Sequence, residues 1–176
     1  MHSGGVERPM SDKLTEDKFL DAINTIYAGF NLMHLKTTEL SYDERLDSNV
    51  SIICKPFMQD ICVCCSSAMS LVSLMNKGRN DADLEDVMTI ICCNCIIYLV
   101  TCQRNIEWYV DNLTVCMIDE SVGDLIDVYI KNMNSIYKQL DEIFEPYVTD
   151  DTREMIKMLN DAFDHQDDDN DSVAPF

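Results

Sequence analysis

The amino-acid sequence predicts an all-α fold, and three observations lead to that prediction. The 176 residues include only 5 Gly and 4 Pro, whereas sandwiches and barrels need turn residues at nearly every strand end. Apolar residues make up 47% of the chain and recur at steps of three and four, the period of an α-helix. The stretch 87–100 is apolar nearly all round, which is typical of a helix buried on every side. We therefore expect a bundle of amphipathic helices around this central helix.

The first helix is expected within residues 11–35. Acidic residues near its start suit the positive end of the helix dipole. Residues 36–40 are interpreted as a connection, and Ser41 with Glu44 fits a capping box that would open a second helix over 42–54. The apolar face of the first helix is formed by Phe19, Leu20, Ile23, Ile26, Tyr27, Phe30 and Met33.

Pro56 marks the next expected boundary, because proline is poorly tolerated in a helix interior. It should end the second helix or open the next one. One or two short helices are expected over 57–77, and Gly78 is a suitable residue to end them. Beyond the central helix, helical spacing continues over 106–140, and a last helix is expected to start at Thr149.

The chain is expected to form one domain. Residues 1–10 contain no apolar run, so we interpret them as a disordered leader rather than a secretory signal. Residues 11–164 are assigned to a single helical domain, since this length can bury one hydrophobic core. Residues 165–176 are acid-rich and are interpreted as a disordered tail.

The charge balance is strongly acidic, with 32 Asp and Glu against 13 Lys and Arg and a net charge of −19. Such a surface repels phosphate backbones and anionic membrane leaflets, so neither nucleic acid nor a membrane is the expected partner. No membrane anchor is expected. Nine cysteines without a secretory signal indicate reduced thiols in a cytosolic or nuclear compartment, and the cytoplasm is the expected location.

The cysteine spacing allows a zinc site as an alternative to buried thiols. Cys62 and Cys65 form one Cys-x-x-Cys pair, and Cys92 with Cys95 forms another. Two such pairs can surround a tetrahedral ion, but both lie in apolar helical runs rather than on polar turns. We therefore interpret them as buried hydrophobic thiols, and no metal or cofactor is predicted. The sequence contains no Gly-rich phosphate loop, no nucleophile elbow and no pair of histidines at metal-binding spacing, so we do not expect an enzyme.

Two segments resemble the Bcl (B-cell lymphoma) family of apoptosis regulators. Residues 109–113, Tyr-Val-Asp-Asn-Leu, followed by Met117 and then residues 125–130, resemble the helix after the central one in that family. Residues 74–78, Leu-Met-Asn-Lys-Gly, resemble the start of the family's first homology motif. The family's arginine at the start of the central helix falls on Asp86, and Arg79 is the nearby candidate to replace it. Together with the small size, these departures resemble viral members of the family.

The resemblance implies an anti-apoptotic protein that sequesters the amphipathic BH-three helix of pro-apoptotic proteins in a hydrophobic groove. An alternative within the same resemblance is a viral inhibitor of innate immune signalling, which binds an adaptor protein without using the groove. An exposed apolar groove also allows a homodimer. The implied groove has a floor of Val87, Met88 and Ile91, and its remaining residues are Leu46, Val50, Phe57, Ile61, Leu71, Leu74, Met75, Arg79 and Leu84.

Overall fold

The structure is a computed structural model that describes residues 14–46, 48–80, 83–115 and 120–170. It contains five α-helices and one short 3₁₀ helix within these ranges, and no strand in the part described. The all-α prediction is confirmed at this level. In chain order the elements are α1 (Glu16–Ser41), α2 (Ser48–Gly78), α3 (Leu84–Val115), α4 (Glu120–Phe144), η1 (Glu145–Tyr147) and α5 (Asp150–Asn170).

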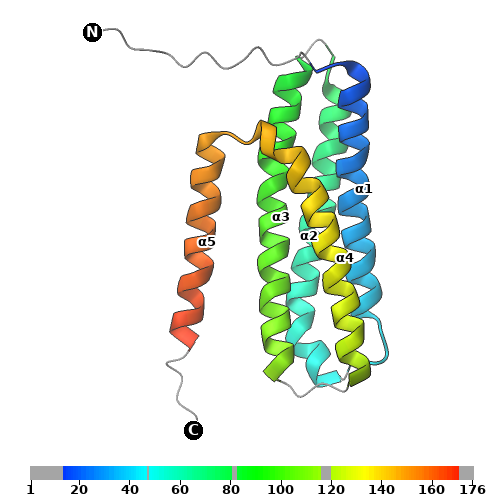
Figure 1. Cartoon of the computed structure of the whole chain (residues 1–176), viewed down its shortest axis with the longest axis vertical. Helices are drawn as coiled ribbons and strands as arrows, with labels where there is room; N and C mark the ends of the chain where they lie inside the picture. The colour runs from blue at the N-terminus through cyan, green and yellow to red at the C-terminus, as the bar shows by residue number, and fades with distance from the viewer. Residues whose placement is uncertain (1–13, 47, 81–82, 116–119, 171–176) are drawn as a thin grey trace, which may run out of the picture.

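Helices α1 to α4 form an antiparallel bundle in which each helix runs opposite to its neighbours in the chain (Figure 1). Helix α1 packs against α2 and α4, and α3 packs against the same two helices from the other side. Short connections force this arrangement, since a connection of a few residues can only join neighbouring antiparallel helices. Helix α5 stands outside the four and contacts α3.

Helix α1 forms where the sequence pattern predicts it, but it is longer. Thr15 caps its start by accepting a hydrogen bond from the Lys18 amide at 3.4 Å. The helix then continues through the expected connection at 36–40 and ends with Ser41, so Ser41 does not open a second helix. The reason is packing, because Thr37 and Leu40 are both buried against the bundle. Burial of these side chains outweighs the weak local preference for a turn.

Helix α2 passes through Pro56 without ending, contrary to the expected boundary. A proline in a helix interior costs about 3 kcal/mol, because it removes one backbone hydrogen bond and crowds the preceding turn. Cys54 and Met58, on either side of Pro56, are both buried. A continuous helix keeps both side chains in the core, and each buried apolar side chain contributes roughly 1.5–3 kcal/mol.

Helix α3 contains the apolar stretch 87–100, but it is not enclosed on every side. Its core face buries residues from Val87 to Tyr109, whereas Ile90 is 46% exposed and Asn94 faces solvent. A four-helix arrangement leaves one face of each helix outward. The expectation that this helix is buried on every side is therefore wrong. Helix α3 is one of the four helices of the bundle and has one face turned outward.

Helix α5 covers part of the outward face of α3. The Arg104 guanidinium of α3 donates a hydrogen bond to the Asn160 side chain at 3.1 Å and pairs with Asp164 at 3.4 Å. The described backbone of α5 is helical to Asn170, six residues beyond the expected domain end at 164. The expected leader, residues 1–10, lies outside the described residues, as do residues 171–176 of the expected tail.

Candidate functional site

The floor of the expected groove lies inside the bundle. Val87 is 4% exposed, and Met88 and Ile91 are 0% exposed. All three belong to the single hydrophobic core that α1, α2, α3 and α4 share. A bound peptide can reach this floor only if α2 and α3 separate, because α2 packs directly on α3.

The walls of the expected groove are divided between the core and the surface. Leu46 and Ile61 are buried, and the Phe57 ring stacks on Trp108 with centroids 3.6 Å apart. Leu71, Met75 and Leu84 are partly buried against the core. Leu74 is 68% exposed. The side chain of Val50 lies outside the described residues.

The Arg79 side chain already has two partners within the chain. Its guanidinium forms an ion pair with Glu16 at 2.6 Å and lies over the Phe19 ring, 4.8 Å from the ring centroid. Both partners belong to the start of α1. Arg79 therefore ties the loop after α2 to α1 by a charge pair and a cation–π contact. Its expected role as a substitute for the family's arginine would require it to leave both partners.

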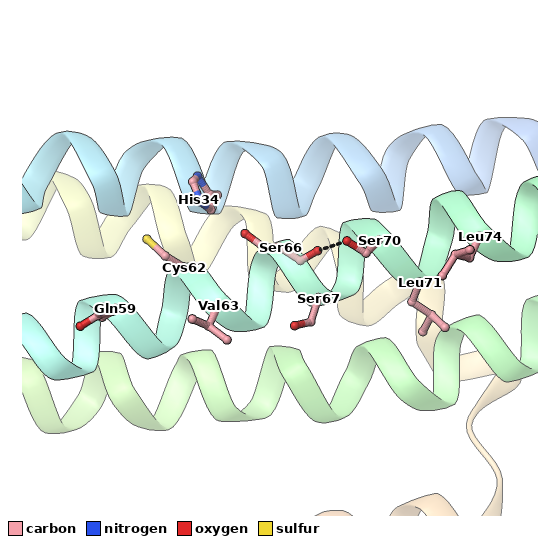
Figure 2. Close-up of a pocket in the computed structure, with 9 residues that line it drawn as sticks. All are labelled: His34, Gln59, Cys62, Val63, Ser66, Ser67, Ser70, Leu71 and Leu74. Carbon is pink, nitrogen blue, oxygen red and sulfur yellow. Dashed lines mark hydrogen bonds between the residues drawn. The ribbon is translucent and has the colours of Figure 1, made fainter.

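A shallow hollow of about 670 Å³ lies on the outward side of α2, next to α1. Figure 2 shows its side chains arranged along α2, with His34 contributed by α1. Two expected groove residues, Leu71 and Leu74, belong to this hollow, so the structure brings together at the surface only part of the implied set. The lining residues are His34, Gln59, Cys62, Val63, Ser66, Ser67, Ser70, Leu71 and Leu74.

The residues that line this hollow include no Asp, Glu, Lys or Arg. No Asp, Glu, Lys or Arg occurs between Asp60 and Lys77, although the whole chain has a net charge of −19. Val63, which lines the hollow, is 58% exposed. The Ser70 hydroxyl donates a hydrogen bond to the Ser66 carbonyl of its own helix at 2.8 Å, so part of its polarity is already satisfied (Figure 2). We call the outward side of α2 from Gln59 to Leu74 the α2 face.

The α2 face was not identified as a unit from the sequence. The sequence does contain a signal for this surface, because residues 61–76 carry no charge in an otherwise acidic chain. Small serines between apolar residues allow another helix to approach closely, while Val63 and Leu74 offer apolar contact area. The chemistry of this surface suits a helix with an apolar side.

The two Cys-x-x-Cys pairs lie inside helices, as interpreted from their apolar neighbours. Cys65, Cys92 and Cys95 are buried. Burial raises the pKa of the Cys95 thiol to about 12, and burial also raises the pKa of Cys92. Among the described residues, no group of three or more His, Cys, Asp or Glu side chains is arranged to hold a metal ion.

Two helical segments are long and apolar enough to cross a membrane by length and composition alone. They are Cys54–Gly78 in α2 and Leu84–Asp111 in α3, with mean hydropathies of 1.5 and 1.7. The core helices of a soluble bundle pass the same test, because they are apolar where they pack together. These two segments pack on each other within the bundle, so the measure does not distinguish a core helix from a membrane span.

Comparison with known proteins gives no match to any family model, curated protein or solved structure.

Proposed function

We propose that this chain is a non-catalytic, cytoplasmic binding protein of the Bcl type, which captures the amphipathic BH-three helix of pro-apoptotic proteins. The observation that supports the proposal best is the α2 face, whose hollow is lined without any Asp, Glu, Lys or Arg on a chain of net charge −19. Transfer of apolar side chains from water to this face provides the driving force, roughly 25 cal/mol per Å² buried. Sequestration of the helix blocks apoptosis without any chemical step.

The proposed contact begins at Leu71 and Leu74, because these are expected groove residues that also line the hollow. An amphipathic helix presents apolar side chains at steps of three and four, and Val63 lies on the same side of α2 as Leu74. Basic residues flanking the apolar side of the partner would be attracted by the acidic remainder of the surface. Access to Val87, Met88 and Ile91 would follow only after α2 moves away from α3.

A second proposed function is supported by the burial of that same floor. If α2 and α3 stay together, the implied groove does not open, and the α2 face is left as the contact surface for a larger partner. This arrangement favours capture of a signalling adaptor protein without use of the groove. A second copy of the chain could also occupy the face and form a homodimer, since an uncharged surface is where two strongly acidic copies repel each other least.

Isothermal titration of the purified full chain against a panel of BH-three peptides tests the first proposal. We expect submicromolar binding of at least one peptide. Light scattering on the same sample gives the mass of the free protein and detects a dimer. Absence of heat with every peptide, from a folded monomer, would contradict the first proposal and favour the second. A dimer that dissociates on peptide addition would place both partners on the same face.

A further inference from the structure

A second hollow, of about 500 Å³, lies between α3 and α4. It is lined by residues between 103 and 111 of α3 and between 130 and 137 of α4, and Met33 of α1 contributes to it as well. Helix α4 diverges from α3 towards the start of α4 (Figure 1), and the hollow lies along this part of the two helices. We call it the α3–α4 hollow. It shares no residue with the α2 face.

The floor of the α3–α4 hollow is formed by core residues. Met33, Ile106 and Met133 all line it, and all three are buried. A methionine side chain is flexible and polarisable, so two of them can adjust to the shape of an apolar group. Ligand sites in proteins are hollows of roughly 300–1,000 Å³ with a mainly apolar lining, and they occur between the helices of bundles. The volume and the floor of this hollow fit that description.

The rim of the α3–α4 hollow carries negative charge. Glu107 and Asp111 line it from α3, whereas the lining includes no Lys or Arg. The Arg104 guanidinium lies 3.3 Å from the Glu107 carboxylate and also pairs with Asp164 of α5 at 3.4 Å. Glu107 is thus partly neutralised. No hydrogen bond or ion pair joins the Asp111 side chain to another of the described residues, so this carboxylate can pair with a cation.

The Tyr137 phenol lines the hollow from α4 and responds to the charge of the rim. Burial raises the pKa of Tyr137, and the negative charges of Asp141 and Glu107 raise it further. A negative potential that opposes ionisation of a phenol attracts a positively charged ligand for the same reason. It also repels an anion, and a neutral ligand gains nothing from it.

We propose that the α3–α4 hollow binds a small organic cation, whose apolar body contacts Met33, Ile106 and Met133 while its ammonium group pairs with Asp111. Gln103 and Asp111, which line the hollow from α3, are eight residues apart, so the lining extends about 12 Å along the helix. This length suits a ring system with a short ammonium arm. The inference does not depend on the proposed function, because the hollow is separate from the α2 face.

The test uses three probes that share one ring system, namely naphthylmethylammonium, naphthylmethanol and naphthylacetate. Each is titrated into the full chain, and the isotope-labelled methyl groups of its 11 methionines are followed by NMR. We expect the cation to shift the signals of Met33 and Met133, which the M33L and M133L variants assign. The exposed Met155 and Met158 of α5 should not respond. The cation should bind at least about fivefold more tightly than the alcohol, and the carboxylate probe should bind most weakly.

A pair of variants tests whether the rim charge selects the cation. D111N should weaken binding of the cation about threefold and leave binding of the alcohol unchanged. D21N is the matched control, because it removes the charge of an exposed aspartate of α1 that does not line the hollow, and it should leave both affinities unchanged.

Four results would overturn the proposal. They are equal affinity for the cation and the alcohol, binding of the cation that D111N does not weaken, shifts confined to the methionines of α2, and the absence of any shift with all three probes. Asp111 and Asp21 are both exposed, so neither substitution is expected to disturb the core, and circular dichroism checks that both variants are folded.

Discussion

The hydroxyl of Thr37 in α1 lies 2.8 Å from the hydroxyl of Tyr129 in α4, and both residues are buried. Thr37 also donates to the Met33 carbonyl, at 2.8 Å. A threonine hydroxyl has only one proton, so Tyr129 must be the donor to Thr37. This chain of hydrogen bonds is a polar link between two helices whose other buried residues are apolar or glycine.

Removal of one partner of this link is expected to destabilise the bundle. T37V keeps the shape of the side chain but leaves the Tyr129 hydroxyl without its acceptor, at a cost of about 1–3 kcal/mol. Y129F leaves Thr37 bonded to Met33, so it should cost less, about 0.5–1.5 kcal/mol. Urea unfolding of the two single variants and the double variant measures these costs and their coupling. Additive costs would show that the two hydroxyls do not interact.

A close approach between α1 and α4 at Gly29 gives a second expectation. A Cβ atom at Gly29 would lie 2.8 Å from a methyl group of the buried Leu140 side chain, with two further Leu140 carbons at 3.1 Å. G29A should therefore destabilise the protein, because overpacking typically costs 1–3 kcal/mol and exceeds the gain of about 1 kcal/mol in helix propensity.

The matched control for G29A is G123A in α4, where an added Cβ meets nothing within 4 Å. This variant should stabilise the protein by about 0.5–1 kcal/mol, since alanine is the better helix former. Thermal unfolding of the two variants should shift in opposite directions. Equal shifts would contradict the close packing of Gly29 against Leu140.

Stability is expected to fall in mildly alkaline solution. Burial raises the pKa of the phenols of Tyr109 and Tyr129 and that of the Cys95 thiol, which reaches about 12. Groups with a raised pKa in the folded state contribute stability that is complete below their unfolded pKa. That contribution is lost as the pH rises from the unfolded towards the folded value. The loss should begin near pH 8.5 for thiols and near pH 10 for phenols, at about 1.4 kcal/mol per pH unit for each group.

Urea unfolding under reducing conditions, from neutral pH to about pH 10.5, measures this dependence. Y129F removes one ionising phenol, so its free energy of unfolding should decline less steeply above pH 10 than that of the parent chain. A free energy of unfolding that stays constant over this range would show that these groups are not buried as described.

Much of the fold could be predicted because apolar periodicity reports burial directly. Phe19, Ile23 and Phe30 were expected on one helix face and are buried together in α1. Boundaries were less predictable, since Pro56 and the run 36–40 carry local signals that tertiary packing overrides. The exposed side chain of Ile90 was also not predictable, because the apolar character of one residue does not determine whether it faces the core or the solvent.

The candidate site was only partly predictable. Leu71 and Leu74 were expected in a binding surface and line the α2 face, whereas Val87 and Met88 are in the core. The sequence does not specify how far α2 is rotated about its axis relative to α3, and this rotation decides which apolar residues remain outside.

The proposed binding of a partner helix to the α2 face is tested most directly by one comparison by titration calorimetry. The BH-three peptide with the highest affinity is titrated into the parent chain, into L74E, and into V128E, which places the same charge on a similarly exposed apolar residue of α4. We predict that L74E weakens binding at least about tenfold, equivalent to 1.4 kcal/mol, while V128E leaves it unchanged. Equal affinity for L74E and the parent chain would show that the α2 face is not the binding surface.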